Sequence, residues 1–358
     1  MRMTTARPSG WRALSERAGL AGWRLPLLVA ALFVGIGGRI LYGLGAPFWF
    51  DETFTGVIAG QPTVAKLFDW CLHELTGPAF YGPMWLWEKL AGSSNFALRL
   101  PGLTLAIVTP LAILRWGNRD PDLRLWWAVF LLLWSPIFAM AGEARAYPEI
   151  FALAAVQALL FVQLLHQPRV GRASAWVVIS SLGMLCNYWA AIPAIVQGLA
   201  FLAVHRFRAI RTWPAFLLLI PLLVWSRFHL PMVLDFTVGN SSGMAGLPLS
   251  DVVKIPSFIL GVGLNGALLF VVVLGSLVIA WKRQPKDRPS DITPERALAL
   301  CGLASVAIVI VLAFVRPNFG QRYLTATMPS FLFALALWAR WMTARNAKAV
   351  VLVMAIMF

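Results

Sequence analysis

The sequence predicts an all-α fold: a polytopic membrane protein with about 10–11 transmembrane helices and two interfacial helices in its first outer loop. Of its 358 residues, 59% are hydrophobic and 13% are charged, whereas an ordinary soluble domain has roughly 45–50% and about 25%. The apolar residues also cluster in stretches near the ~20 residues that span a bilayer core. This composition excludes a disordered chain and argues against a soluble globular enzyme.

Ten apolar stretches predict the membrane spans. They are Leu25–Ala46, Phe96–Leu114, Leu125–Ala141, Ala146–Leu165, Ala173–Ala190, Ala191–Val204, Thr212–Leu230, Ser257–Trp281, Ala297–Val315 and Leu324–Trp341. An eleventh begins at Ala349 and stops at Phe358, which is too short for the ~17–25 residues of a helical span. That segment therefore either ends buried or belongs to a longer chain.

The distribution of charge predicts the topology. The net charge is +15, from 30 Lys and Arg against 15 Asp and Glu. The basic residues fall in short gaps between apolar stretches, not on a soluble basic face, so no nucleic acid partner is expected. If residues 1–24, which carry five arginines, are cytoplasmic, 21 of the 30 basic residues lie inside. The positive-inside rule selects this arrangement, with 25–358 as a transmembrane domain in the plasma (inner) membrane behind an uncleaved N-terminal anchor.

Two outer, periplasmic loops are sizeable, 47–95 and 231–256. In the first, apolar residues between Thr63 and Thr76 recur at helical spacing, and a second short helix is predicted at about Pro83–Ala91. We expect both helices to lie in the interface. A span at the second would invert every later loop and place the arginine-rich ones outside.

Two adjacent carboxylates, Asp51 and Glu52, follow the first span beside the aromatic run Phe48-Trp49-Phe50. Charged groups at the membrane surface are costly unless they are used. Partial desolvation would raise the pKa of such a carboxylate and suit it to act as a general base. The alternative is that Asp51 N-caps a helix running toward Gly60, with Glu52 in its first turn.

Arginines also occur on the outer face, where positive charge is disfavoured. Glu143 and Arg145 share a short turn between two apolar stretches, and Arg316 and Arg322 lie in the segment 316–323. Each arginine could bind a substrate phosphate, with Glu143 near the reacting centre. Equally, each could snorkel to lipid headgroups at a helix end.

Two further arginines lie near the ends of the first two spans. Arg39 is expected to snorkel or to pair with a neighbouring helix, and Arg99 could be an interfacial anchor. The three cysteines and four histidines show no metal-ligand spacing. They are Cys71, Cys186, Cys301, His73, His166, His205 and His229.

Four motifs occur in a fixed order along the chain. They are Phe50-Asp51-Glu52-Thr53-Phe54, Leu90-Ala91-Gly92 with Ala97-Leu98-Arg99-Leu100-Pro101, Glu143-Ala144-Arg145-Ala146-Tyr147, and Arg322-Tyr323-Leu324 with Pro329. In these residues the sequence resembles the polyprenyl-phosphate-sugar-dependent glycosyltransferases of the GT-C type. More narrowly, it is similar to the bacterial relatives of protein mannosyltransferases and of the aminoarabinose transferase of lipid A. The resemblance covers roughly residues 25–341.

The resemblance implies transfer of a monosaccharide from a polyprenyl-phosphate donor to a glycan, lipid or protein acceptor. The reaction would take place on the extracytoplasmic face, with inversion. Asp51 would deprotonate the acceptor, making its oxygen the nucleophile. Glu52 and Glu143 would orient the acceptor or bind a divalent cation, with Asp51, if one is used. No other cofactor is implied.

The same resemblance assigns the donor phosphate to cationic residues. Arg145 and Arg322 would neutralise the phosphate as it leaves, and Tyr323 could donate a hydrogen bond to it. Further candidates for acceptor or phosphate contacts are His73, Tyr81 and Tyr147. Together, Asp51, Glu143, Arg145 and Arg322 are expected to converge on one outward-facing cavity.

The sequence departs from the family pattern at 76–81, where relatives often carry His-Pro-Pro or Lys-Pro-Pro. Here the basic residue is missing, and His73 is its nearest substitute. Two other functions therefore stay open: a transporter or flippase of a lipid-linked sugar, and a non-catalytic subunit with the same fold. A transporter should show inverted-repeat hydropathy between its halves, and no such symmetry is found.

Overall fold

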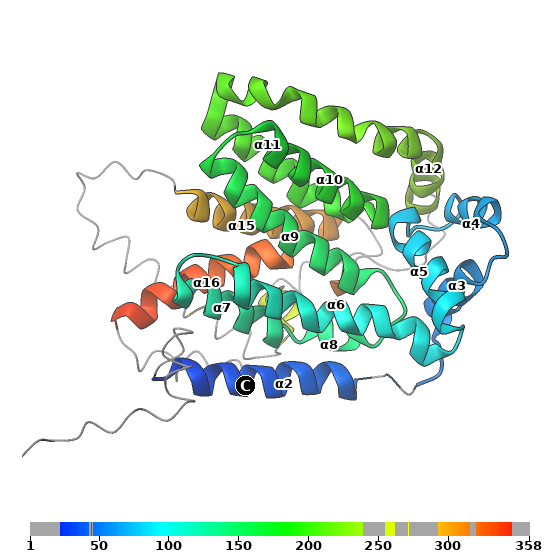
Figure 1. Ribbon diagram of the computed structural model, residues 1–358, viewed down its shortest axis with the longest axis horizontal. Helices are drawn as coiled ribbons and strands as arrows, with labels where there is room; N and C mark the ends of the chain where they lie inside the picture. The colour runs from blue at the N-terminus through cyan, green and yellow to red at the C-terminus, as the bar shows by residue number, and fades with distance from the viewer. Residues whose placement is uncertain are drawn as a thin grey trace, which may run out of the picture.

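The computed structural model describes residues 22–42, 44, 46–238, 255–261, 271, 293–315 and 320–345. Within these ranges every regular element is a helix (Figure 1), which confirms the expected all-α class for this part of the chain. The helices are α2 (Arg24–Leu41), α3 (Phe50–Ala59), α4 (Val64–Cys71), α5 (Pro78–Ala91), α6 (Asn95–Trp116), α7 (Pro121–Leu133), α8 (Pro136–Ala141), α9 (Tyr147–His166), α10 (Val170–Cys186), η1 (Tyr188–Ala190), α11 (Ala191–His205), η2 (Arg206–Leu219), α12 (Ile220–Val238), α13 (Ile255–Leu260), α15 (Pro294–Val315), η4 (Gln321–Leu324) and α16 (Met328–Arg345).

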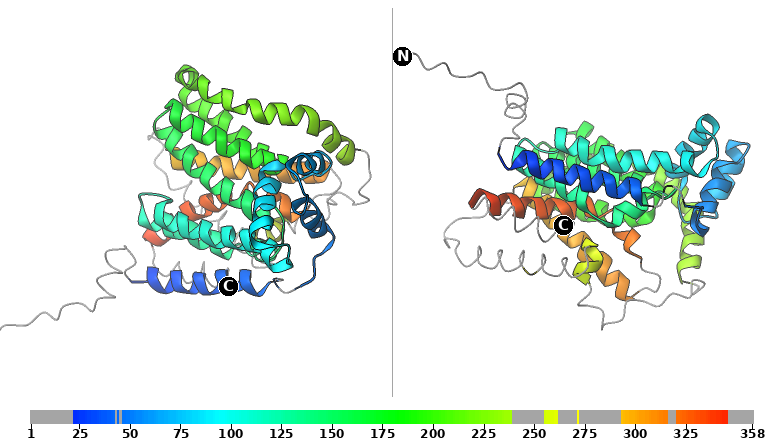
Figure 2. Two further views of the ribbon diagram at one scale, coloured as in Figure 1. Left: turned by 45° about the vertical axis from the view of Figure 1, so that its right-hand side comes forward. Right: turned by 90° about the horizontal axis from the view of Figure 1, so that it is seen from below.

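The long helices form a bundle, and α3, α4 and α5 gather at one end of it, where α2 finishes (Figures 1 and 2). In the bundle, α7 packs against α2, α6 and α16, and α9 packs against α6, α10 and α15. In the part of the chain that the structure describes, five helical stretches are long and apolar enough to cross a membrane. They are Arg24–Leu41, Asn95–Trp116, Tyr147–His166, Tyr188–Phe236 and Pro294–Phe314.

The stretch expected as one span, Leu125–Ala141, is broken into α7 and α8. Pro136 causes the break, because proline has no N–H to donate to the carbonyl of Leu132. Arg39 of α2 replaces that donor: its guanidinium bonds the carbonyl oxygens of Leu132 at 2.6 Å and Leu131 at 2.8 Å. Arg39 is fully buried, so it pairs with a neighbouring helix and does not snorkel.

Two glycines allow α2 to approach α7 and α8 this closely. A Cβ on Gly35 would lie 2.7 Å from the carbonyl oxygen of Leu132, and one on Gly38 would lie 2.6 Å from the ring of Phe138. Larger residues would therefore separate the helices, which is why small residues recur where apolar helices pack closely.

At the end of the bundle opposite α3–α5, two acids at the start of α7 pair with arginines of α2 and α16. Asp122 pairs with Arg24 at 2.6 Å, and Asp120 pairs with Arg340 of α16. Asp120 also accepts hydrogen bonds from the first turn of α7. The starts of α2 and α7 thus lie at one end of the bundle, as expected if α5 is not a span.

The helices of the first outer loop differ from the prediction. The loop holds three helices rather than two, because α3 precedes the expected pair. The first of the pair, α4, ends at Cys71 rather than Thr76. The second, α5, begins at Pro78 rather than Pro83, since proline is well suited to the first turn of a helix.

The second outer loop also begins later than predicted. Its expected start, Pro231, lies within α12, which continues to Val238. Most of 239–256, the position of Arg316 and the eleventh apolar stretch from Ala349 lie outside the described residues, as do 1–21 of the basic N-terminus.

Candidate active site

The first turn of α3 presents its two acids in different directions. The helix begins at Phe50, and its N-cap is Trp49, not Asp51, so the predicted capping role for Asp51 is wrong. The backbone N–H of Trp49 donates to Oε2 of Glu52 at 3.2 Å. Consecutive helical residues point about 100° apart, so the adjacent side chains of Asp51 and Glu52 reach different partners.

Glu52 is completely buried and pairs with Arg99 of α6. Nη2 of Arg99 lies 2.6 Å from Oε2 and its Nε lies 2.8 Å from Oε1. Oε1 also accepts from the backbone N–H of Ala144 at 2.7 Å. With the bond from Trp49, each carboxylate oxygen accepts two hydrogen bonds, so Glu52 ties α3, α6 and the 142–146 turn together.

Asp51 pairs instead with Arg322, which lies 271 residues away in η4. Nη1 of Arg322 donates to Oδ2 of Asp51 at 2.9 Å, and both side chains are about one-quarter exposed, at 28% and 25%. Three aromatic rings surround the Arg322 guanidinium at 5.6–6.0 Å. They belong to Trp49, Tyr147 and Tyr323. The pair is thus accessible and held by aromatic contacts.

Arg145 connects this pair to α5 and to the segment between α4 and α5. Its Nη1 donates to the backbone oxygen of Asp51 at 3.0 Å and to the hydroxyl of Tyr81 at 3.3 Å. Its Nη2 lies 3.2 Å from Oε1 of Glu74 and 3.4 Å from Oγ1 of Thr76. Arg145 is only 7% exposed, and its Nε is buried with no hydrogen-bond partner. One donor of this cation therefore stays unused.

Glu143 lies in the same turn, and none of the described residues forms an ion pair or hydrogen bond with its carboxylate. Burial raises its pKa to about 7, the Glu52 carboxylate adds to the rise, and Arg322 and Arg145 oppose it. Glu143 can therefore gain or lose a proton near neutral pH, as a general base or acid requires.

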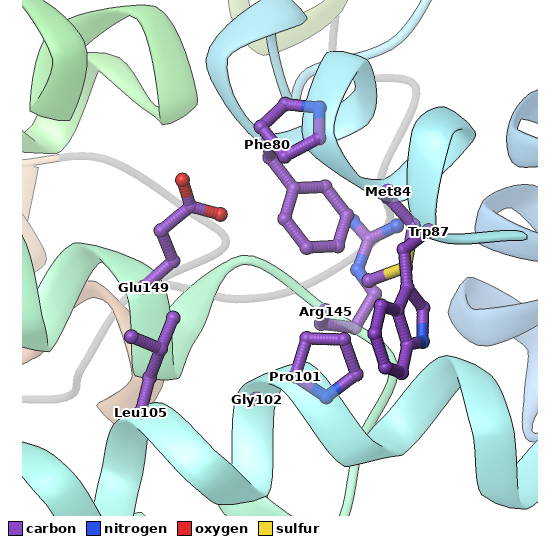
Figure 3. Close-up of a pocket in the computed structure, with 9 residues that line it drawn as sticks. Phe80, Met84, Trp87, Pro101, Gly102, Leu105, Arg145 and Glu149 are labelled. Atoms are coloured by element: carbon purple, nitrogen blue, oxygen red, sulfur yellow. The ribbon is translucent and has the colours of Figure 1, made fainter. Parts of the chain in front are cut away.

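A cavity of about 230 Å³ adjoins this cluster between α5, α6 and the start of α9 (Figure 3). Of its lining residues, Arg145 and Glu149 are charged and the others are apolar or glycine. The apolar and glycine residues are Phe80, Pro83, Met84, Trp87, Pro101, Gly102 and Leu105. Asp51, Glu143, Arg145 and Arg322 were expected to line one cavity. Of these four residues, Arg145 alone lines this cavity.

The described residues do not assemble a metal site. In the ranges that the structure covers, no three His, Cys, Asp or Glu side chains cluster as ligands. The candidate set of Asp51, Glu52 and Glu143 does not fit a divalent cation, because all four hydrogen bonds to Glu52 come from N–H groups that a cation would displace.

The remaining candidates divide by position. Tyr81 contacts Arg145, and Tyr147 and Tyr323 contact Arg322. By contrast, Nδ1 of His73 lies 2.8 Å from the backbone oxygen of Asp69, four residues earlier in the chain. His73 thus does not replace the missing basic residue of 76–81 in this cluster.

Sequence reasoning missed three residues of the site: Glu74, Arg99 and Glu149. Arg99 stands in a motif that the sequence analysis quoted, but its partner Glu52 is 47 residues away. Glu74 lies between α4 and α5, and nothing in the sequence except its charge indicates a functional role. Glu149 falls within the predicted span Ala146–Leu165, and its place in the lining of the cavity is the observation that connects it to the site.

Comparison of the chain with protein-family models, with curated proteins and with solved structures yields no match. The residues and their geometry therefore provide the basis for a functional proposal.

Proposed function

We propose that the chain is a polytopic membrane protein with its candidate site at the extracytoplasmic interface. The five long apolar stretches support this placement, as do exposed apolar side chains on the outside of the bundle, such as Phe33, Leu199 and Leu223. Several basic residues lie at the helix ends away from α3–α5, where the positive-inside rule would place the cytoplasm. They are Arg24, Arg115, Arg124, Arg169, Arg172 and Arg340.

At this interface we infer a glycosyltransferase that moves a monosaccharide from a polyprenyl-phosphate donor to a hydroxyl of a glycan, lipid or protein. The observation that carries the proposal is the partly exposed pair of Asp51 and Arg322, beside Arg145 and Glu143. A phosphate leaving group needs cations more than it needs protonation, and the acceptor hydroxyl needs a base. The cluster supplies both.

The pair also suggests how substrate could activate the base. A donor phosphate approaching Arg322 would compete with Asp51 for the guanidinium, and charge-assisted bonds to phosphate are strong. Asp51 would then be free to take the acceptor proton. The acceptor oxygen attacks the anomeric carbon, the bond from that carbon to the phosphate oxygen breaks, and its electron pair leaves with the phosphate. Arg322 and Arg145 would neutralise the resulting charge.

Glu52 has a different part in this proposal. Its oxygens are already occupied by N–H donors, so we infer that it positions Asp51 and the 142–146 turn without contacting substrate. The proposal contains no step through a metal ion.

The proposal is tested with purified protein in nanodiscs. The nanodiscs are offered a panel of radiolabelled polyprenyl-phosphate sugars together with an envelope glycolipid extract as acceptor. Loss of label from the donor lipid in the wild type, at least ~100-fold slower in Asp51→Asn, supports transfer with Asp51 as base. Asp69→Asn, which changes an exposed acid of α4, is the matched control and should keep full activity.

Equal loss of label in the wild type and in Asp51→Asn would contradict the role of Asp51. If the wild type consumes no donor but moves the lipid between leaflets in a flipping assay, the transferase proposal is wrong and the chain is a transporter.

A further inference from the structure

The segment η2 (Arg206–Leu219) is a 3-10 helix of 14 residues, much longer than the three or four residues that are usual for this type of helix. It begins at Arg206, which is also the C-cap of α11 and has a φ of 48°. A 3-10 helix has 3.0 residues per turn, so side chains at i and i+3 stand in straight rows. The sequence of η2 sorts into three such rows.

The first row runs from Arg206 to Leu218 and is small and buried at its three middle positions. Ala209, Thr212 and Ala215 are 4%, 0% and 1% exposed. They allow η2 to pack closely against α10, and Thr212 satisfies its hydroxyl by donating to the backbone oxygen of Ala209 at 2.7 Å. This row fixes which way the other two rows face.

The second row is apolar and exposed. Phe207, Ile210 and Trp213 are 86%, 64% and 60% exposed. Beside it runs the third row, in which Arg208 and Arg211 are exposed, and Arg206 is exposed where η2 begins. An aromatic and aliphatic row next to arginines is typical of a surface that lies at the boundary of acyl chains and headgroups.

Acidic side chains are rare around this surface. The chain has no Asp or Glu from residue 150 to residue 234, and the three arginines form no ion pair among the residues that the structure describes. The surface also lies at the end of the bundle opposite the candidate site, because His205 bonds the carbonyl of Leu165 at the far end of α9. An anion that binds these arginines would therefore not have to displace an acidic partner among the described residues.

We propose that Phe207, Ile210 and Trp213 together with Arg206, Arg208 and Arg211 form a binding site for anionic phospholipid. The apolar row would contact the acyl chains near the glycerol, and the guanidinium groups would bind the phosphate and the anionic headgroup. Anionic lipids are enriched at cytoplasmic surfaces, where each nearby arginine strengthens binding by about fivefold. This inference rests on the membrane placement proposed above, but not on sugar transfer.

The experiment measures lipid preference without reference to activity. Detergent-purified protein is incubated with equal amounts of phosphatidylglycerol and phosphatidylcholine and purified again, and the retained lipids are quantified by mass spectrometry. We expect the wild type to retain phosphatidylglycerol preferentially. The variant R206Q/R208Q/R211Q should lower the ratio of retained phosphatidylglycerol to phosphatidylcholine at least about fivefold. The charge-conserving variant R206K/R208K/R211K should keep most of it.

Arg115, in the last turn of α6, and Arg119, just after it, provide the control, because both are exposed at the same end of the bundle. The variant R115Q/R119Q should retain the wild-type ratio. The proposal is overturned if the η2 glutamine variant keeps the wild-type ratio, or if R115Q/R119Q lowers it equally, since the preference would then reflect general surface charge.

Discussion

The guanidinium of Arg99 and the carboxylate of Glu52 form a buried bidentate ion pair, with side chains only 2% and 0% exposed. Arg99 also donates to the backbone oxygen of Ala46 at 2.6 Å, in the segment that joins α2 to α3. The pair therefore fixes the position of α3, and with it Asp51, against the bundle. An arginine that served only as an interfacial anchor would be exposed to the lipid headgroups, whereas Arg99 is buried.

Removing one partner of this pair should destabilise the protein strongly. Glu52→Gln keeps the shape of the side chain but leaves the Arg99 charge buried and unpaired, which costs about 3–5 kcal/mol. The loss should be visible as a lower thermal unfolding midpoint in detergent. Glu88→Gln breaks the neighbouring surface pair with Lys89 and should change stability by less than about 1 kcal/mol. Similar losses in both variants would contradict the positioning role of Glu52.

The accessible pair of Asp51 and Arg322 should behave in the opposite way. Because both side chains are about one-quarter exposed, Asp51→Asn and Arg322→Gln should unfold near the wild-type temperature. Turnover should fall about 10²–10⁴-fold in Asp51→Asn, the usual contribution of a general base. Arg322→Gln should weaken donor binding by about 10–100-fold, as expected for a lost charged contact, and should also lower kcat, because the leaving phosphate loses a neutralising cation.

Steady-state kinetics separate these two effects. A raised donor KM together with a lowered kcat in Arg322→Gln, and a lowered kcat alone in Asp51→Asn, fit the proposed roles. A raised donor KM with an unchanged kcat in Asp51→Asn would mean that Asp51 binds the substrate and is not the base.

Glu143 should make stability depend on pH. Its pKa is raised by burial to about 7 in the folded protein, above the ~4.3 of an exposed glutamate. Between these values the folded state holds a proton that the unfolded state has released, so the free energy of unfolding falls as pH rises through about 7. Glu143→Gln removes this proton exchange, so its unfolding temperature should exceed that of the wild type at pH 8 but not at pH 4.5. A constant difference across this range would contradict a raised pKa.

The sequence was sufficient for several long helices but not for the partners of the charged residues. Apolar stretches predicted α6, α9, α11 and α15 to within a few residues, because such stretches are a local feature of the sequence. The break at Pro136 was present in the sequence as a proline, but only the Arg39 guanidinium, supplied from another helix, lets the break lie within a buried stretch.

The site shows the same limit more clearly. Asp51 and Glu52 are adjacent and chemically alike, yet one pairs with Arg322 and the other with Arg99. The choice depends on the direction of α3 relative to α6 and η4, which no local pattern encodes. The catalytic and phosphate-binding parts of Asp51, Glu143, Arg145 and Arg322 stay predictions.

His229 of α12 should matter for donor binding although it lies outside the cluster. Its Nε2 lies 2.7 Å from the backbone oxygen of Glu74, and its Nδ1 lies 3.0 Å from the hydroxyl of Tyr188. Glu74 in turn pairs with Arg145. The histidine, which is 1% exposed, thus holds the segment that orients Arg145.

His229→Leu leaves the Glu74 carbonyl buried without its donor, which costs about 1–3 kcal/mol. Donor KM should therefore rise roughly 5–100-fold, with a smaller change in kcat, because Arg145 remains present but is held less firmly. Tyr188→Phe keeps the ring contact with His229 and should give a weaker version of the same effect. His205→Leu is the matched control: it breaks a comparable bond, to Leu165, at the far end of the bundle. If His205→Leu raised the donor KM as much as His229→Leu, the effect would come from general loosening of the fold rather than from Arg145.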